Sequence, residues 1–285
     1  MNWFTPATME EFAAALSQCG AGGQVIAGGT DYTIRLRQGK TVPETLIYPG
    51  RIPALHEIEL TQTYLHIGAM VTMSEMKRAL ESVPEFAAIA DAAGGVGSPQ
   101  IRSKATIAGN LCNASPAGDM LPIGKLYALH AEVLSGDGSV TEIPMDAFLL
   151  GPGKNALEPG QAVVALRADR KECTGCVSAF RKIGFRSHVS IARIGMAALV
   201  QFGSDDVVER ARLTLGAVAN VPIRVPEAET LLLGRKLDQA LLEEVTAVIS
   251  RTVHDNCRPT NRLYKTEATR GLCADLFAQL QKRGT

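Results

Sequence analysis

Apolar positions near the start of the chain recur at the spacing of a helix. Between residues 12 and 19 they would line one face of that helix. Thr8 and Glu11 precede them at the spacing of a capping box, in which the two side chains satisfy free backbone N–H groups of the first turn. Gly20 follows the last apolar position and is typical of a helix end. The pattern therefore predicts a helix that begins at Thr8 and ends before Gly20.

The same reasoning divides the rest of the chain into short strands and helices. Thr72 and Glu75 form a second capping box, Pro84 suits a first helical turn, and Asp238 suits an N-cap. Gly136-Asp137-Gly138 separates two apolar stretches and predicts a hairpin. Strands are expected at residues 24–27, 46–48, 64–67, 131–134, 140–143, 194–202 and 211–217. Helices are expected at residues 32–38, 72–80, 84–93, 226–233 and 238–251, and in the last stretch, where Leu272, Leu276 and Leu280 share a face.

The order of strand and helix patterns along the chain changes near Cys173. Before this point strands and helices are mixed, and after it two strand patterns are followed by helical patterns. Strands and helices that are not regularly alternated are typical of α+β folds. The sequence therefore predicts an α+β protein of two domains, residues 1–175 and 176–285.

The stretch from Lys104 to Pro122, KATIAGNLCNASPAGDMLP, organises the prediction of function. It has few bulky apolar residues, and Pro116 and Gly118 punctuate it, so that we expect neither a regular helix nor a strand. Its backbone N–H groups can be approached closely at Gly109 and Gly118. Hydroxyl, amide or carboxylate groups stand at Thr106, Asn110, Asn113, Ser115 and Asp119. Together these groups suit a polar, phosphate-bearing ligand.

A second polar loop, Gly28-Gly29-Thr30-Asp31, follows the strand expected at 24–27 and precedes a helical stretch. A strand that ends in glycines before a helix presents free N–H groups, which attract phosphate. The alternative is a plain strand-to-helix turn, and the loop alone does not exclude it. Gly39-Lys40-Thr41 follows too far along the chain for the spacing of a Walker A sequence, so that the loop is not one. Gly20-Ala21-Gly22-Gly23 precedes a strand instead of following one, which excludes a Rossmann fingerprint.

The composition limits the classes of protein. The chain has 285 residues, of which 46% are apolar and 20% charged, and its formal net charge is zero. This length allows two hydrophobic cores. Because the charge is balanced, there is no basic excess that would bind nucleic acid or an anionic membrane surface. The first residues do not resemble a signal peptide, and no apolar run is long enough to span a bilayer. We therefore expect a cytoplasmic protein.

The six cysteines are expected to be thiols, because disulfides are rare in cytosolic proteins. Cys173-x-x-Cys176 has the spacing of half a metal or iron–sulfur site, or of a redox pair, but no second pair accompanies it. We therefore expect two exposed free thiols between the domains and no metal site. Cys112 is expected to be a small packing residue of the polar stretch. No motif for a nucleophile or a catalytic metal is present, so that no catalytic side chain is predicted.

Taken in order, the polar stretches resemble those of the FAD-binding subunits of the molybdenum hydroxylases, the family of xanthine, carbon monoxide and nicotinate dehydrogenases. The first stretch is Ala27 to Asp31, with the sequence AGGTD. The second is Gln100-Ile101-Arg102 followed by Ala105 to Asn110, and the third is Ser115-Pro116 with Asp119. The resemblance covers nearly the whole chain, through Phe4, Ile67-Gly68-Ala69, Phe180-Arg181-Lys182 and Pro222-Ile223-Arg224.

The resemblance implies a two-lobed FAD-binding domain of the PCMH type, with lobes of about residues 1–57 and 58–175, and a smaller C-terminal domain of antiparallel sheet and helices. FAD would lie extended between the lobes. Its pyrophosphate would be held, chiefly through backbone N–H groups, by Ala27, Gly28, Gly29, Thr30 and Asp31, and from the other side by Thr106, Gly109 and Asn110. Asp119 would accept hydrogen bonds from the ligand, Val96 and Gly97 would line the adenine or ring channel, and Lys182 would place a positive charge near the flavin or its phosphates.

The resemblance also implies an electron-transfer subunit that acts within a heteromeric complex. Electrons would arrive from a [2Fe–2S] small subunit, having started at a molybdopterin large subunit that hydroxylates the substrate, and FAD would pass them to NAD or another acceptor. A dimer of heterotrimers is the assembly expected for the family, and the xanthine or nicotinate branch is favoured. Two alternatives stay open: a self-sufficient FAD oxidoreductase, and an assembly subunit with a vestigial flavin site.

Four positions depart from the family pattern. Ala108 replaces the first of two glycines, and an alanine with φ > 0 would cost about 1 kcal/mol and alter the loop. Ser103 replaces an asparagine, and Lys265 stands where many relatives have arginine. Ser190 stands where an aspartate is common, close in sequence to Lys182, and would change the outlet for electrons.

Overall fold

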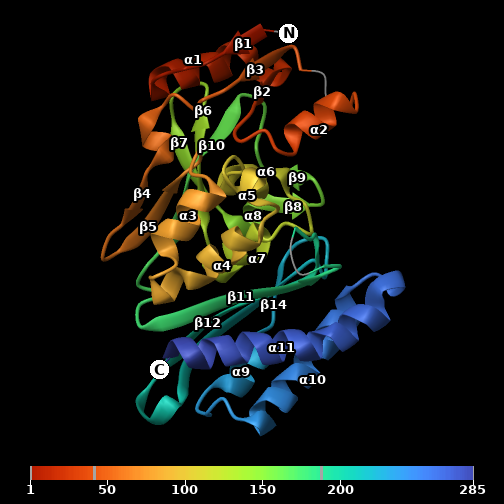
Figure 1. The fold of residues 1–285 in the computed structure, drawn as a ribbon. Coiled ribbons are helices and arrows are strands. Elements are labelled where there is room, and N and C mark those ends of the chain that lie inside the picture. The colour runs from red at the N-terminus through yellow and green to blue at the C-terminus, as the bar shows by residue number, and fades with distance from the viewer. Residues whose placement is uncertain (1, 41–42, 187–188, 285) are drawn as a thin grey trace.

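A three-stranded parallel sheet forms the N-terminal end of the molecule (Figure 1). The computed structural model describes residues 2–40, 43–186 and 189–284. The strand order of this first sheet is β1-β3-β2, and α1 and α2 lie beside it (Figure 1). The bounds are β1 (Asn2–Phe4), α1 (Met9–Cys19), β2 (Gly23–Val25), α2 (Tyr32–Arg37) and β3 (Thr45–Ile47). The helices predicted after Thr8 and at residues 32–38 are therefore confirmed.

The predicted capping box at the start of α1 is formed only in its Thr8 half, because the Glu11 carboxylate accepts from Ala7 N instead of Thr8 N. Glu11 N donates to Thr8 Oγ1 (3.2 Å), and Ala7 N donates to the Glu11 carboxylate (2.7 Å). Phe12 and Leu16 are buried in a core that also holds residues of the next sheet, such as Leu134. The burial of this helical face joins the two sheets.

A five-stranded antiparallel sheet of order β4-β5-β10-β6-β7 forms the middle of the molecule. Its strands are β4 (Ile58–Leu60), β5 (Tyr64–Gly68), β6 (His130–Ser135), β7 (Val140–Pro144) and β10 (Gln161–Asp169). The predicted hairpin is confirmed by the pairing of β6 with β7. The central strand β10 was missed, because six of its nine residues are buried and the run lacks the polar alternation of a half-exposed strand.

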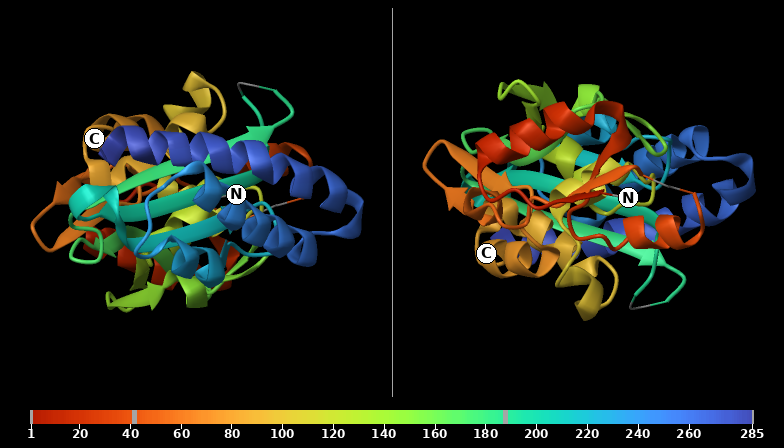
Figure 2. Two further views of the ribbon diagram at one scale, coloured as in Figure 1. Left: turned by 90° about the horizontal axis from the view of Figure 1, so that it is seen from below. Right: turned by 90° about the horizontal axis from the view of Figure 1, so that it is seen from above.

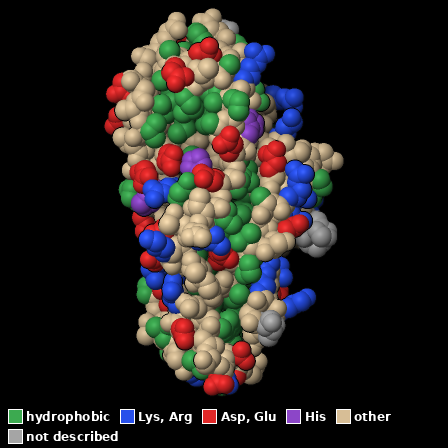
Figure 3. Space-filling model, turned by 90° about the vertical axis from the view of Figure 1, so that its left-hand side faces the viewer, with side chains coloured by type: hydrophobic (Ala, Val, Ile, Leu, Met, Phe, Trp, Pro, Cys, Tyr) green, Lys and Arg blue, Asp and Glu red, His purple; other side chains and the backbone are tan. Residues whose placement is uncertain are grey.

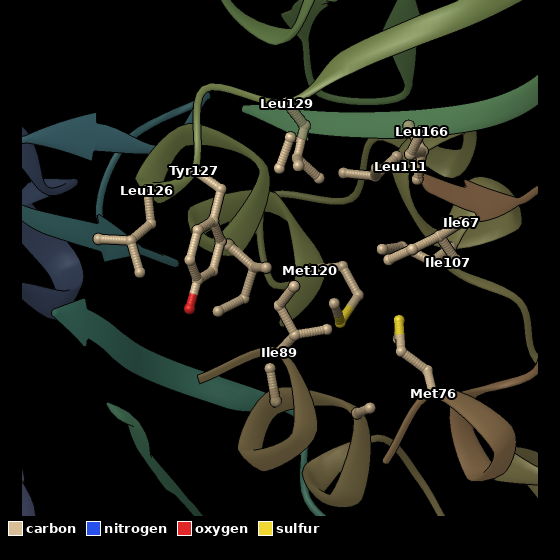
Figure 4. Packing of buried hydrophobic residues seen from close by; sticks show 14 of the residues in the cluster. Ile67, Met76, Ile89, Ile107, Leu111, Met120, Leu126, Tyr127, Leu129 and Leu166 are labelled. Atoms are coloured by element: carbon tan, nitrogen blue, oxygen red, sulfur yellow. The ribbon is translucent and has the colours of Figure 1, made fainter. Parts of the chain in front are cut away.

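Helices cover this middle sheet and build the largest core. They are α3 (Met73–Leu80), α4 (Ala87–Gly95), α5 (Pro99–Arg102), α6 (Ile107–Asn113), α7 (Met120–Leu126) and α8 (Met145–Phe148). Figure 4 shows Met76, Ile89 and Met120, from three of these helices, converging on the side of the sheet that carries Ile67 and Leu166. The second predicted capping box, Thr72 with Glu75, is formed at α3. These contacts fix the helices that carry the polar stretches.

The prediction that residues 104–122 form no regular helix was wrong. The stretch contains α6 and the start of α7. Pro116 and Gly118 lie in the turn between these two helices. Thr106 Oγ1 accepts a hydrogen bond from Gly109 N (3.0 Å) and caps α6. Pro122 lies in the first turn of α7, where its missing N–H leaves no intrahelical bond unmade. Both helices are short, so that Pro116 and Gly118 lie outside them and interrupt neither.

The C-terminal part is a four-stranded antiparallel sheet followed by helices. Its elements are β11 (Cys176–Gly184), β12 (Ala192–Phe202), β13 (Val208–Gly216), β14 (Ile223–Arg224), α9 (Pro226–Leu232), α10 (Gln239–Asn256) and α11 (Arg262–Gly284). Asp238 caps α10 as predicted, by accepting from Leu241 N (2.8 Å). The predicted apolar face of the last helix is buried at Leu272 and Leu276. Strand β11 was not predicted, although it forms one edge of this sheet.

The C-terminal sheet lies between two groups of helices (Figures 1 and 2). One face packs on α4 and α7, and the other packs on α11. At this junction Asp91 of α4 accepts hydrogen bonds from Phe180 N (3.1 Å), Gln279 (2.9 Å) and Arg283 (2.7 Å). The junction between β10 and β11 falls at residues 170–175. The domain division at 175 and the lobe division near 57 stay predictions.

The remaining elements are a small two-stranded sheet and five 3₁₀ turns within the described ranges. They are η1 (Gly20–Gly22), η2 (Pro53–His56), η3 (Pro84–Phe86), β8 (Leu149–Gly151), β9 (Lys154–Asn155), η4 (Ser204–Asp206) and η5 (Pro259–Asn261). Across the parts of the chain that the structure describes, no helix is both long and apolar enough to cross a membrane. On the face that Figure 3 shows, acidic and basic side chains are interspersed, in keeping with the zero net charge.

Candidate functional site

A cavity of about 410 Å³ lies between the loop after β2 and helix α6. Its walls come from segments far apart in the sequence, including the start of α2 and the turn before β10. Among the predicted cofactor-binding residues, those that line it are Ala27, Gly28, Gly29, Thr30, Asp31, Val96, Thr106, Gly109 and Asn110. The other three, Gly97, Asp119 and Lys182, are not among its lining residues. The structure thus brings together the first two of the three motifs described in the sequence analysis, residues 27–31 and residues 100–110.

The loop of residues 27–31 is packed closely against the chain near Lys104. A Cβ atom at Gly28 would lie 1.8 Å from the Lys104 carbonyl oxygen, so that only glycine fits without a shift of the backbone. Gly29 has φ +71°, a conformation that favours glycine. The backbone N–H groups of residues 27–31 have no hydrogen-bond acceptor within the described ranges. The loop therefore carries a run of free donors along the cavity wall.

Helix α6 forms the facing wall. Thr106, Gly109, Asn110 and Asn113 stand at positions i, i+3, i+4 and i+7, which is the spacing of one helix face, and all of them line the cavity. Asn110 Oδ1 also accepts a weak hydrogen bond from Met120 N (3.4 Å), which ties this wall to α7. The face offers a hydroxyl, two amides and one position without a side chain.

The strain considered for Ala108 is absent. Ala108 lies inside α6, is buried, and is not among the residues with positive φ. Alanine is the best helix former, so that its presence in place of glycine favours the local structure. The expected alteration of the second loop is therefore not seen.

Asp119 and Lys182 form a buried ion pair that joins the start of α7 to β11. Lys182 Nζ donates to Asp119 Oδ2 (2.5 Å), Gly95 O (2.9 Å) and Ser190 O (3.1 Å). The side chains are 16% (Lys182) and 5% (Asp119) exposed. Burial raises the pKa of the Asp119 carboxyl, and the positive charge of Lys182 opposes this shift. Asp119 Oδ1 is buried and has no partner in the described parts of the chain, so that one acceptor stays unused.

The turn that carries Val96 and Gly97 is held by Arg102. The Arg102 guanidinium donates to Val96 O (3.2 Å) and Gly97 O (2.9 Å). Gly97 has φ +48°, and a Cβ there would lie 2.8 Å from the Ile101 side chain. Arg102, which belongs to the second motif, therefore acts on the shape of this turn.

Sequence reasoning missed polar side chains of α2 and of the segment before β10. Tyr32 and Arg35 of α2 line the cavity, and Arg35 Nη2 donates to Asn113 Oδ1 (2.5 Å) across it. Asn155 lines it as well and donates to Cys112 O (2.7 Å). A signal was present for α2: the helix directly follows the glycine loop, and residues 32 and 35 are spaced to share one face.

All six cysteines are free thiols, as predicted. The expected exposure of Cys173 and Cys176 was wrong, because they are 0% and 3% exposed. Burial raises the pKa of Cys173 to about 12 and also raises that of Cys176. Cys112 lines the cavity from α6, and burial raises its pKa to about 12. No group of His, Cys, Asp or Glu in the described ranges could hold a metal ion.

We expect the thiols of Cys173 and Cys176 to resist alkylation in the native chain. Because they are buried with raised pKa values, the reactive thiolate should be scarce at pH 8. Mass spectrometry after treatment with iodoacetamide should show both sites modified at less than about a tenth of the rate of the partly exposed Cys19. Unfolding in guanidinium is the control and should make all sites react alike. Rapid native modification of either site would contradict the burial of this turn.

Comparison with protein families gives two consecutive matches. Residues 1–168 match the family described as "FAD binding domain in molybdopterin dehydrogenase". Residues 178–280 match the family described as "CO dehydrogenase flavoprotein C-terminal domain". Together the two matches cover nearly the whole chain and meet close to the start of β11.

Relatives of known name agree with these matches. The chain is 30% identical to the nicotinate dehydrogenase FAD-subunit of Eubacterium barkeri over 98% of its own length and 95% of the relative. It is 29% identical to the xanthine dehydrogenase FAD-binding subunit of Escherichia coli O157:H7, over 81% of this chain and 78% of that subunit. In the Gallus gallus xanthine dehydrogenase/oxidase (25% identical), it covers 87% of its own length but 19% of the relative.

Solved structures share the fold. The cyanide-inactivated Cu,Mo-CO dehydrogenase superimposes with a TM-score of 0.87 at 23% identity, over 99% of this chain and 98% of the other. Quinoline 2-oxidoreductase from Pseudomonas putida 86 superimposes with a TM-score of 0.88 at 18% identity, over 100% of this chain and 98% of the other. The predicted α+β fold, with an antiparallel sheet and helices in its C-terminal part, is confirmed.

Proposed function

This chain belongs to the FAD-binding subunits of the molybdenum hydroxylases, the family of carbon monoxide and xanthine dehydrogenases, and we propose that it passes electrons from a [2Fe–2S] partner subunit through FAD to NAD or another acceptor. The observation that carries this proposal is the cavity in which the free N–H groups of residues 27–31 lie opposite the polar face of α6. These are the two walls on which the first two family motifs stand.

The residues present fit FAD. Free backbone donors suit a pyrophosphate, which is an acceptor without donors. Among the lining residues, Tyr32 has a buried hydroxyl oxygen that lacks a partner in the described ranges, which is costly unless a ligand completes it. The cavity volume of about 410 Å³ lies within the usual range for small-molecule sites.

We assign the following roles to the residues of this chain. Residues 27–31 hold the pyrophosphate through their backbone N–H groups, and Thr106, Gly109 and Asn110 hold it from the α6 side. Val96 lines the channel beside the ring system, and Gly97 shapes the turn that carries Val96. Asp119 accepts a hydrogen bond at its free oxygen, while Lys182 neutralises its charge and holds it in place. When bound, FAD supplies the reversible uptake and release of electrons.

The remaining steps belong to partner chains in this proposal. The chain spans 95% of the nicotinate dehydrogenase FAD-subunit but 19% of the chicken xanthine dehydrogenase/oxidase, which carries much more in one polypeptide. We propose that a [2Fe–2S] small subunit and a molybdopterin large subunit complete the enzyme, with a dimer of heterotrimers as its assembly. The substrate would be hydroxylated on the large subunit, with a xanthine- or nicotinate-like substrate favoured.

The vestigial-site alternative loses its main support. It depended on strain at Ala108, and Ala108 is an unstrained residue of α6. A self-sufficient oxidoreductase would need a substrate site of its own beside the flavin ring. No feature of the described cavity favours this alternative over an electron-transfer subunit.

An absorption spectrum of the purified chain tests the proposal. We expect the two bands of a flavin, without an iron shoulder, and release of FAD on heating, identified by mass spectrometry. Partner chains that co-purify with the tagged chain from its own host should carry the iron and molybdenum, measured by elemental analysis. A colourless chain that takes up no added FAD would refute the flavin assignment. A flavin-loaded chain that hydroxylates a substrate without partners would support the self-sufficient alternative.

A further inference from the structure

Arg35 is the one cation among the lining residues that the structure describes. The charged residues in the lining are Asp31, Arg35 and Glu158. A pyrophosphate brings two negative charges, and two carboxylates in the same cavity oppose it. Free N–H groups carry partial charge only, so that among the described lining residues Arg35 supplies the one full positive charge.

The position of Arg35 is held from across the cavity. One guanidinium nitrogen donates to Asn113 Oδ1 (2.5 Å), and this hydrogen bond connects α2 to α6. No hydrogen bond or ion pair occupies its other N–H groups within the described ranges. A guanidinium fixed by a neutral amide keeps its full charge, and its remaining donors suit a phosphate.

Tyr32 stands beside Arg35 with an unused hydroxyl. The two residues are three positions apart on α2, and both line the cavity. Tyr32 Oη is buried and has no hydrogen-bond partner in the described parts of the chain. Burial also raises the pKa of the Tyr32 hydroxyl from its ordinary value, so that the hydroxyl keeps its proton and can donate at neutral pH. A buried donor without a partner points to a ligand that accepts from it.

Part of the cavity wall is apolar. Its lining residues include Leu16, Val25, Ile26, Ile47 and Pro49. A flat aromatic base next to its phosphates would be buried by such a wall, since burial of apolar surface is favourable. The Asp119–Lys182 pair, by contrast, is not part of this lining.

We propose that Tyr32 and Arg35 form a subsite for the adenosine diphosphate half of the dinucleotide, and that the chain binds this half on its own. The inference rests on the proposed function and adds to it that α2, outside the family motifs, selects the nucleotide end. Arg35 pairs with a phosphate, Tyr32 donates to a phosphate or ribose oxygen, and the apolar wall covers the base. Flavins that lack this half bind without using α2.

Titration calorimetry of the flavin-stripped chain with FAD, ADP and riboflavin tests the subsite. We expect Arg35→Gln to raise the dissociation constants of FAD and ADP by about 10- to 100-fold, as the loss of a charged hydrogen bond does. Tyr32→Phe should raise both by about 3- to 10-fold. Riboflavin affinity should change less than about twofold in either variant. Arg37→Gln is the matched control, since Arg37 is on the same helix but outside the lining.

A salt series separates direct phosphate contact from an effect on structure. ADP binding to the wild-type chain should weaken as salt rises, and this dependence should become shallower in Arg35→Gln, because screening acts on the charge pair. Equal losses for ADP and riboflavin, or unchanged ADP affinity in both variants, would overturn the subsite while the binding of FAD leaves the proposed function intact. A wild-type chain that binds no FAD would overturn both.

Discussion

Replacing Asp119 with alanine is expected to lower the free energy of unfolding of the flavin-free chain by about 3 kcal/mol, since removal of one partner leaves the other charge buried and uncompensated. The Lys182 side chain is 16% exposed, and the other acceptors of its ammonium group are two neutral carbonyl groups, Gly95 O and Ser190 O. A residue that only touched the ligand would leave the stability of the flavin-free chain unchanged. The ion pair thus makes Asp119 a structural residue as well as a candidate ligand contact.

Lys182→Met is expected to destabilise the chain by a similar amount at pH 7, and less as the pH falls. Burial already raises the pKa of Asp119, and loss of the Lys182 charge removes what opposes this shift. The folded variant then binds a proton more readily than the unfolded chain does. Its stability should therefore fall as pH rises from the ordinary aspartate pKa through the raised one, and it should recover towards acid.

A double-mutant cycle in urea measures the pair directly. Asp119→Ala combined with Lys182→Met should cost clearly less than the sum of the two single changes, because no buried charge is left unpaired. Glu227→Ala is the control, since its pair with Arg251 is 60% and 57% exposed and should contribute at most about 1 kcal/mol. Additive single changes, or a flavin-free chain as stable as the wild type, would contradict the coupling of the two side chains.

Flavin retention and potential add a second readout to the same variants. Asp119→Ala should release FAD more easily, because the free carboxylate oxygen is lost. Lys182→Met should shift the midpoint potential of bound flavin if the ammonium lies near the ring, and leave it unaltered if the charge acts only on Asp119.

Local signals along the chain predicted most helices correctly. The capping box at Thr72 and the N-caps at Thr8 and Asp238 are formed with the hydrogen bonds expected of them. Such signals act within one helical turn and do not depend on distant parts of the chain. The positive φ of Gly29 is local in the same sense, whereas the close packing of Gly28 is against Lys104, far along the chain.

The features that were not predicted from the sequence depend on packing between distant parts of the chain. Strand β10 has no alternation to recognise, because neighbours cover it on both faces, and β11 is likewise buried over its first five residues. Cys173 and Cys176 were expected to be exposed because they were placed in a loop between the domains, yet the turn they form packs into the core. The pairing of Asp119 with Lys182 joins residues 63 positions apart, which no spacing rule reaches.

Replacing Gly28 with alanine is expected to abolish most FAD binding, with a dissociation constant raised by about 100-fold or more. The added Cβ would meet the Lys104 carbonyl oxygen at 1.8 Å and its carbon at 2.6 Å, and these backbone atoms cannot rotate away as a side chain could. The loop of residues 27–31 must move off the chain near Lys104. Its N–H groups then lose their alignment opposite α6, and we expect a loss of stability of about 1–3 kcal/mol as well.

Gly271→Ala is the matched control for this change. Gly271 lies within α11, and nothing stands within 4 Å of the Cβ that alanine would add. The substitution should stabilise the chain by up to about 1 kcal/mol, since alanine favours the helix, and leave FAD affinity unchanged. Calorimetry and thermal melts of both variants check the pair of expectations. If Gly28→Ala bound FAD as the wild type does, the cavity wall would not depend on the contact with Lys104, and the free N–H groups of the loop could not be what holds the pyrophosphate. A loss of FAD affinity in Gly28→Ala, with ADP affinity lost in parallel and riboflavin affinity kept, would place that role on this loop.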